Sequence, residues 1–360
     1  MGIVKERVKR FERACSRTVR AALRLTLDKP RPAAGRLDPS TVRRVLIVRQ
    51  DSRLGNLLLL TPLLKGIRNA FSSAETDILV SDAYGEILRH NPDLGRIYVL
   101  PKAMFLPDPS LPWRLVRNLR RNSYDLVFDA SAMQAFSLSS AALAALSGAE
   151  RKVGFDRGDA GLFLNCLVPP PDLPLHETRI LFSLLRHVAP GAVEPAFTPQ
   201  CHLTEAEKDE GQRLWASWGL GAHDVAVFVG ARAAKRWPVE DFLELARRIL
   251  AAGRRCVFFA GPAEQALVER LRQPAGLFLA PPLPLRRFAA VLAQARAVVT
   301  ADTGPMHLAV SLGVPTVEIF QGSEPWRFGY AHLPGHHVID AEGRRPGVDE
   351  VWESLQGLLR

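Results

Sequence analysis

The chain has 360 residues, of which 47% are hydrophobic, and a formal net charge of +10. This length suits two domains better than one hydrophobic core, and no apolar run approaches the roughly 20 residues that a membrane span needs. Its four cysteines are far apart and form no C-x-x-C pair, so they indicate neither a zinc site nor a disulfide framework.

The first 36 residues are strongly basic. Eleven Lys or Arg against three acidic residues give +8 of the +10, so the rest of the chain is nearly neutral, which argues against a nucleic-acid surface. Apolar residues recur at helical spacing, at Ile3, Val4, Val8, Phe11, Cys15, Val19, Ala22 and Leu23. Basic amphipathic helices are typical of anionic membrane surfaces. Residues 1–27 therefore form either a membrane-binding helix or a disordered basic tail, and we assign 1–40 to this segment and a proline-rich linker.

Strand-like and helix-like segments alternate from about residue 41 to 195. The run Val45–Arg49 is β-like, a glycine-bearing loop follows at Gln50–Asn56, and Leu57–Phe71 has helical spacing. This loop lacks the G-x-G-x-x-G spacing of a dinucleotide fingerprint. Further expected elements are strands at Ile78–Val80 and Asp125–Phe128 and a helix at Ala135–Leu146.

Prolines and glycines accumulate near residues 190–203 and predict a domain boundary there. A second alternating region follows at 196–345, with a last helix within 346–360. Its expected strands are Val225–Val229, Cys256–Ala260, Ala297–Thr300 and Thr316–Phe320. Strands that alternate with helices predict a parallel sheet in each half.

The second region begins with a β-like run and a glycine turn, Val225–Ala231, followed by the cation Lys235. Such a loop lies at the carboxyl end of a strand, where open α/β sheets bind ligands. Lys235 is a compact charge suited to neutralising phosphate. The alternative is that Lys235 is an ordinary solvated cation at the surface, which the same sequence pattern would also allow.

The most informative stretch is 302–307, which follows an apolar strand-like run and opens a helix-like one. We expect Asp302 to cap this helix, with Pro305 in its first turn and Gly313 at its end. A helix N-terminus carries spare N–H groups and a partial positive charge, which suit a phosphate or pyrophosphate. The expected donors, since proline has none, are the N–H groups of Thr303, Gly304 and Met306. An ordinary strand-to-helix turn is the alternative.

The chain resembles glycosyltransferase family 9, the lipopolysaccharide heptosyltransferase family, in three segments that fit in order and separation from about Arg43 to Tyr330. These are VLIVRQDSRLGNLLLLTPLLKGIRNAF, VFVGARAAKRWP and ADTGPMHLAVSLGVPTVEIFQGSEPWRFG. The resemblance implies an α/β protein of two Rossmann-like domains facing across a cleft (the GT-B arrangement), whose last helix returns to the first domain. It also implies an inverting transfer of heptose from an ADP-sugar to lipopolysaccharide core or a related glycolipid, without metal or cofactor.

The resemblance places the diphosphate and the donor sugar at the turn of Asp302. It also puts Glu264 where the family has an acid that contacts the nucleoside, although a first-turn acid favoured by the helix dipole is equally consistent. His307 lies one turn into the helix and faces either the donor or the sheet. The expected donor-binding residues are Lys235, Glu264, Asp302, Thr303, Gly304, Pro305, Met306 and His307.

The catalytic base departs from the family pattern. The family's loop after the first strand usually ends in Gly-Asp, and this chain has Gly55-Asn56. An amide cannot take up a proton, so Asp51 in the same loop is the substitute carboxylate, and Asn56 could position the acceptor hydroxyl. The expected catalytic residues are Asp51, Asn56 and Lys235. A base from elsewhere, and a binding protein without transferase activity, are the alternatives.

Cations near the expected cleft predict an acceptor site. Arg49 and Arg53 follow the first strand and Arg327 lies in the closing motif, which together would suit a phosphorylated glycolipid. With the basic N-terminus, this predicts a cytoplasmic enzyme that is peripheral on the inner face of the cytoplasmic membrane. Its partners would be a nucleotide-sugar, a glycolipid and an anionic membrane surface, and no nucleic acid.

Overall fold

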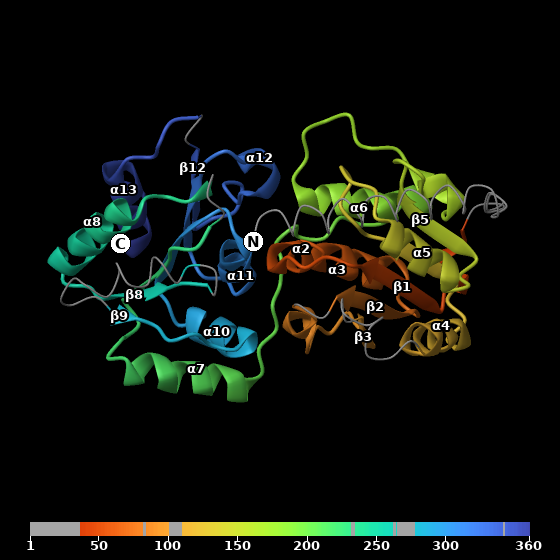
Figure 1. The fold of residues 1–360 in the computed structure, drawn as a ribbon, viewed down its shortest axis with the longest axis horizontal. Coiled ribbons are helices and arrows are strands. Elements are labelled where there is room, and N and C mark those ends of the chain that lie inside the picture. Colours follow the sequence, from red (N-terminus) through yellow and green to blue (C-terminus); the bar gives the residue numbers. More distant parts are fainter. Residues whose placement is uncertain are drawn as a thin grey trace, which may run out of the picture.

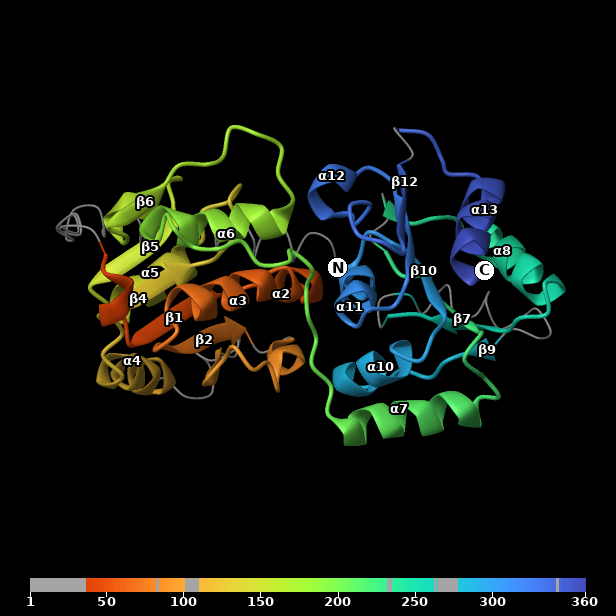
Figure 2. The ribbon, with the colours of Figure 1, turned by 180° about the vertical axis from the view of Figure 1, so that it is seen from behind.

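The computed structural model describes residues 37–81, 84–100, 110–231, 235–261, 264, 278–340 and 343–360. In these ranges, two parallel six-stranded sheets lie side by side, each with helices packed on it (Figures 1 and 2). The basic segment expected at residues 1–27 lies outside the described residues. Among the helices that are described, none has the length and apolar character needed to span a bilayer.

The first sheet has the strand order β3-β2-β1-β4-β5-β6. Its strands are β1 Arg44–Arg49, β2 Glu75–Ser81, β3 Ile97–Leu100, β4 Leu126–Asp129, β5 Arg151–Phe155 and β6 Cys166–Val168. The helices around it are α2 Leu54–Leu58, α3 Thr61–Ala70, α4 Leu111–Arg121, α5 Leu138–Leu146 and α6 Glu177–Val188. Three short 3-10 turns accompany them, namely η1 Pro39–Thr41, η2 Gly85–Leu88 and η3 Ala160–Leu162.

The second sheet has the order β12-β11-β10-β7-β8-β9. Its strands are β7 Val225–Phe228, β8 Cys256–Phe259, β9 Phe278–Leu279, β10 Ala297–Ala301, β11 Thr316–Phe320 and β12 His336–Asp340. The helices around it are α7 Glu205–Ser217, α8 Val239–Ala251, α10 Leu285–Leu292, α11 Gly304–Ser311, α12 Pro325–Phe328 and α13 Val348–Leu359.

Both sheets are doubly wound in the same way. In each, the chain runs outward on one side of the first strand and then reverses, so that β1 lies beside β4 and β7 beside β10. Ligands of such sheets bind at this reversal, outside the carboxyl ends of the strands. The expectation of two Rossmann-like domains is confirmed.

The helix expected at Leu57–Phe71 is two helices. α2 begins three residues earlier, at Leu54, and the chain breaks at Leu59 and Leu60 before α3. Pro62 lies in the first turn of α3. Proline lacks an N–H group and clashes with the preceding turn, so it starts a helix readily and interrupts one that would otherwise continue.

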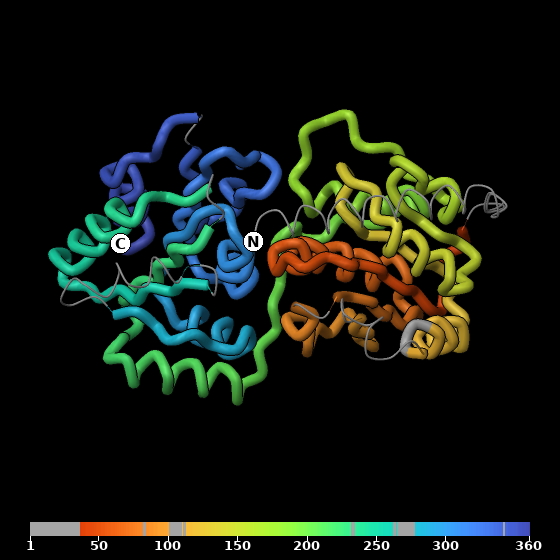
Figure 3. The backbone as a smooth tube through the Cα atoms, in the orientation of Figure 1, coloured from red at the N-terminus to blue at the C-terminus, as the bar shows by residue number. Residues whose placement is uncertain are grey.

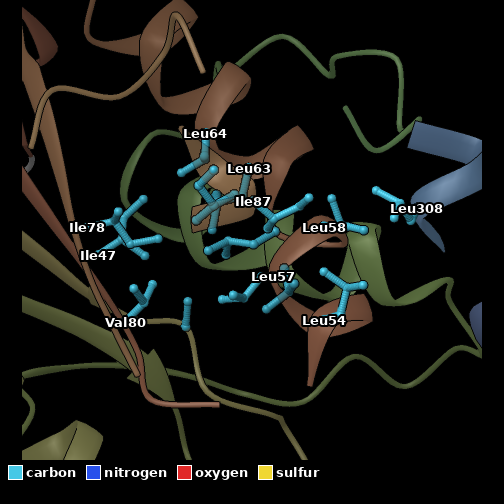
Figure 4. Packing of buried hydrophobic residues seen from close by; sticks show 14 of the residues in the cluster. Ile47, Leu54, Leu57, Leu58, Leu63, Leu64, Ile78, Val80, Ile87 and Leu308 are labelled. Atoms are coloured by element: carbon cyan, nitrogen blue, oxygen red, sulfur yellow. The ribbon is translucent and has the colours of Figure 1, made fainter. Parts of the chain in front are cut away.

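The contact between the domains has an apolar part at α2 and α11. Leucines of α2 point toward Leu308 of α11, and Leu57, Leu58 and Leu308 are completely buried (Figure 4). Each such side chain contributes about 1.5–3 kcal/mol when fully buried. Since α2 follows β1 and α11 follows β10, this packing holds the binding edges of the two sheets against each other.

The last helix lies on the second domain, so the expectation that it returns to the first domain is wrong. Figure 3 shows the C-terminus beside α8. The apolar face of α13, with Val351 and Leu355, is buried in one cluster with β7, β10 and α8. Arg254 Nη2 also donates to the Leu359 carbonyl at 2.9 Å. This face is fully used within its own domain.

Candidate functional site

A cavity of about 720 Å³ lies between the two binding edges. Its first-domain wall consists of Ser52, Arg53, Leu54, Gly55, Asn56, Tyr84 and Glu86. Its second-domain wall consists of Phe228, Lys235, Phe259, Ala260, Gly261, Ala280, Pro281, Pro282, Leu283, Leu285, Phe288, Asp302, Thr303, Gly304, Pro305, His307 and Phe328. Most of the expected donor residues therefore meet in one place, together with the loop that follows β1.

The N-terminus of α11 opens into this cavity, with Pro305 in the first turn as expected. Its N-cap is Thr303, which corrects the assignment of Asp302 as the cap. The Met306 N–H donates to the Thr303 carbonyl at 3.1 Å, so it is not the spare donor we expected. The N–H groups of Thr303 and Gly304 have no acceptor among the described residues, and these two remain available to a ligand.

The Asp302 carboxylate accepts instead from Lys235 Nζ. Lys235 follows β7 and Asp302 follows β10, so the pair lies at the reversal of strand order in the second sheet. The Asp302 side chain is 7% exposed and that of Lys235 is 29% exposed. The ammonium group is therefore oriented by a buried carboxylate and still reaches the cavity.

His307 lines the cavity from the first turns of α11. Its Nδ1 lies 2.7 Å from the Tyr330 hydroxyl in a hydrogen bond that our sequence analysis did not foresee. Burial lowers the pKa of His307 to about 4, so the ring is neutral at physiological pH. It can exchange hydrogen bonds with a donor sugar, and it adds no positive charge.

The helix α2 touches α11 at two glycines, Gly55 of α2 and Gly304 of α11. A Cβ added at Gly55 would lie 3.0 Å from His307 Nε2 and nearer still to Cδ2, and one at Gly304 would lie 3.0 Å from the Leu54 Cβ. Real Cβ atoms essentially never come as close to a neighbour as one at Gly55 would, and one at Gly304 would make a tight contact. Glycine at position 55 is therefore a condition for this contact between the domains, and glycine at 304 favours it.

One end of the cavity is aromatic and proline-lined. The Phe228 and Phe288 rings have centroids 6.3 Å apart, and those of Phe259 and Phe288 are 5.1 Å apart. Pro281 and Pro282 extend this surface. A flat aromatic ring such as a nucleobase fits here. These residues were not predicted from the sequence as part of the site, although Phe228 and Phe259 end the strands β7 and β8, which were both expected.

Glu264 lies beside this end but is not among the residues that line the cavity. It is 8% exposed, and its Oε1 lies 3.8 Å from Arg236 Nη2. It is close behind Gly230 and Gly261, where an added Cβ would meet its carboxylate. The carboxylate therefore lies directly behind Gly261, which lines the cavity.

The loop after β1 brings Asp51 and Asn56 together. Asn56 Nδ2 donates to Asp51 Oδ2, and Arg49 Nη2 lies 3.5 Å from the same oxygen. The Ser81 hydroxyl donates to the Asp51 carbonyl at 2.5 Å. Asn56 lines the cavity, whereas Asp51 stands behind it with its side chain 22% exposed.

Two cations expected to meet an acceptor are buried elsewhere. Arg49 is completely buried and donates to the Ala130 carbonyl. Arg327 donates from Nε and Nη2 to Glu177 Oε2 at 2.9 and 2.5 Å, which joins the two domains by a buried ion pair. Arg53 is exposed at the cavity as expected. In the described part of the chain, no group of three or more His, Cys, Asp or Glu could hold a metal ion.

Two doubly wound domains that share one phosphate-suited cavity define the chain as a protein of the GT-B class. A model of glycosyltransferase family 9 (heptosyltransferase) matches residues 112–344. The chain belongs to this family and is a glycosyltransferase.

Two relatives of this chain are also heptosyltransferases by name. Lipopolysaccharide heptosyltransferase 1 of Pseudomonas aeruginosa is 30% identical over 304 residues, which cover 78% of this chain and 79% of the relative. The Escherichia coli K12 protein of the same name is 27% identical, covering 79% and 90%.

Solved structures show the same fold. A family 9 glycosyltransferase from Veillonella parvula has a TM-score of 0.78 at 21% identity, covering 91% of this chain and 99% of that one. E. coli heptosyltransferase WaaC with ADP-2-deoxy-2-fluoro heptose has a TM-score of 0.68 at 23% identity, covering 87% and 99%.

Proposed function

We propose that this glycosyltransferase moves a heptose from ADP-heptose onto lipopolysaccharide core, with inversion at the anomeric carbon and without a metal ion. The observation that carries the proposal is the arrangement of Lys235 beside the free N–H groups of Thr303 and Gly304 at one cavity wall. The names of the similar proteins, lipopolysaccharide heptosyltransferases 1 and 2, support the choice of sugar and acceptor.

The donor is oriented by the cavity's two unlike ends. The diphosphate accepts from Lys235 and from the Thr303 and Gly304 N–H groups, while the base lies against the three phenylalanines. Glu264 accepts from the ribose hydroxyls after a small movement of the wall at Gly261. Fixed positive charge at the departing diphosphate stabilises the charge that develops there, which is often the largest catalytic contribution. Lysine and backbone dipoles thus supply what a metal ion supplies elsewhere.

The acceptor hydroxyl attacks the anomeric carbon from the face opposite the diphosphate. The new bond to the acceptor oxygen forms as the bond from the anomeric carbon to the phosphate oxygen breaks, so the configuration inverts and ADP leaves. Asp51 takes the hydroxyl proton. The Asn56 amide donates to Asp51 and orients it, which leaves the Asn56 carbonyl oxygen to accept from a neighbouring hydroxyl of the acceptor sugar and so align the attacking one.

The acceptor approaches past Arg53, the exposed cation of the first-domain wall. We also propose that the enzyme works peripherally at the cytoplasmic face of the inner membrane and that residues 1–27 contribute to its attachment. The +8 charge of residues 1–36 supports this, since each basic residue near an anionic leaflet contributes about 1 kcal/mol.

Release of ADP from ADP-heptose in the presence of core acceptor tests the transfer, and the anomeric configuration of the product tests inversion. We expect Asp51→Asn to lower kcat by about 10²–10⁴-fold, the usual contribution of a general base, with little change in the Kd of ADP. Asp209→Asn, on the exposed face of α7, is the matched control. An unchanged kcat in Asp51→Asn would refute the base assignment, and no acceptor-dependent ADP release by the wild type would refute the transfer.

A further inference from the structure

The outward face of α4 exposes a tryptophan that the fold does not use. Trp113 is 76% exposed, more than the five other large hydrophobic residues that stand out on the described surface. It borders a recess of about 450 Å³ lined by Trp113, Val116, Arg117, Arg120 and Arg121, which we call the α4 face.

Other contacts hold α4 in place. Leu119 is completely buried beneath the helix, and Arg120 Nε donates to the Leu146 carbonyl of α5 at 3.1 Å. After the helix, Asn122 Nδ2 donates to the Tyr98 hydroxyl at 2.8 Å. The indole of Trp113 is therefore free to meet a partner without a change in the fold.

The charged residues of α4 all have one sign. Residues 110–124 contain four arginines, all on α4, and no Asp or Glu. Arg114, Arg117, Arg120 and Arg121 are all exposed. An indole among cations on one helix is suited to a phosphate-rich interface, because tryptophan prefers the headgroup level of a bilayer and arginine pairs with lipid phosphates.

We propose that the α4 face docks on a bilayer that contains anionic lipid, with Trp113 inserted at the headgroup level. This surface belongs to the first domain and is separate from residues 1–27. Figures 1 and 2 show α4 at the end of the first domain that lies away from the second domain. The inference rests on α4 alone and does not depend on the proposed transfer.

Quenching of tryptophan fluorescence by bromine-labelled lipids distinguishes this contact from one made by residues 1–36, which contain no tryptophan. The full-length chain is mixed with vesicles of phosphatidylcholine and phosphatidylglycerol. We expect quenching in the wild type and its loss in Trp113→Phe. Trp326→Phe, which removes another exposed tryptophan from α12 of the second domain, is the matched control and should keep the quenching.

Charge is tested by sedimentation with the same vesicles. The double variant Arg117→Gln/Arg121→Gln should bind roughly tenfold to thirtyfold more weakly than the wild type. Arg213→Gln/Arg247→Gln, which removes two exposed cations from α7 and α8, should bind as the wild type does. Vesicles of phosphatidylcholine alone should bind weakly in every case.

Three results would overturn the proposal. These are quenching that persists in Trp113→Phe, equal losses in the two double variants, and tighter binding of the α4 face to duplex DNA than to anionic vesicles at the same salt concentration.

Discussion

Gly55→Ala tests how tightly the two domains meet at the cavity. The added methyl group would lie 3.0 Å from His307 Nε2 and 3.2 Å from Cγ, so the ring or α2 would have to move by roughly 1 Å to reach ordinary contact. The ring cannot turn away freely, because its Nδ1 is hydrogen-bonded to the buried Tyr330 at 2.7 Å. Overpacking of this kind costs about 1–3 kcal/mol.

We therefore expect a lower free energy of unfolding by about 1–3 kcal/mol and a roughly tenfold higher Kd for ADP, which corresponds to about 1.4 kcal/mol. Denaturant unfolding and calorimetric titration with ADP measure the two quantities. Gly66→Ala is the first control, since its methyl group would lie 2.5 Å from Phe182 Cε2 within the first domain. It should destabilise the protein without changing the Kd.

Gly191→Ala is the second control, because nothing lies within 4 Å of the added atom, and it should change neither quantity. If Gly55→Ala matches the wild type in both stability and ADP affinity, the close approach of α2 to His307 does not exist in solution, and the reasoning fails.

Three further predictions concern charges. Lys235→Ala should raise the Kd of ADP by roughly ten- to a hundredfold, because it removes a hydrogen bond from a charged donor to the diphosphate. The Kd of adenosine, which has no phosphate, should stay unchanged in the same calorimetric titration. Equal losses of affinity for both ligands would contradict the role of Lys235. Arg327→Met should lower the free energy of unfolding by about 3–5 kcal/mol, because it leaves the buried Glu177 carboxylate without its partner. The double variant Arg327→Met/Glu177→Met should recover most of the lost stability. No recovery in denaturant unfolding would argue against the ion pair. Burial raises the pKa of Glu318 to about 8. Between pH 4.5 and 8, the folded state therefore keeps a proton on Glu318 that the unfolded state releases. The contribution of Glu318 to the free energy of unfolding is complete below pH 4.5 and falls by about 1.4 kcal/mol per pH unit as the pH rises toward 8. Glu318→Gln should remove this slope from denaturation curves recorded across that range, and an unchanged slope would assign it to other groups.

Much of the fold could be predicted from local patterns. The runs that became β1, β7 and β10 are mostly apolar, as expected for parallel sheets buried on both faces. The strands β3 and β9 escaped notice because they are short, with four and two residues, and lie at the edges of their sheets, where they are only partly buried.

Residues could be placed near the cavity from the sequence where a suitable chemical group follows a recognisable strand. Lys235 and Thr303 line the cavity, and each follows a strand that could be recognised in the sequence. Their role in donor binding stays a prediction. Side-chain partners could not be foreseen. Asp302 contributes to an ion pair rather than to a cap, and Tyr330 reaches His307 across 23 residues of sequence.

Burial was the other source of error. Arg49 ends a buried strand, and a sequence pattern cannot show whether such a cation turns toward solvent or toward the carbonyl of Ala130, which follows the neighbouring strand β4. The position of α13 also depended on which domain offers an apolar surface for it to pack against, and this is a property of the assembled fold.

A crystal structure of the enzyme with ADP-heptose tests the central claim most directly. The account predicts diphosphate oxygens within about 3.2 Å of Lys235 Nζ and of the Thr303 and Gly304 nitrogens, with the adenine against Phe228, Phe259 and Phe288. A diphosphate bound away from the N-terminus of α11, or held chiefly by first-domain residues, would contradict it.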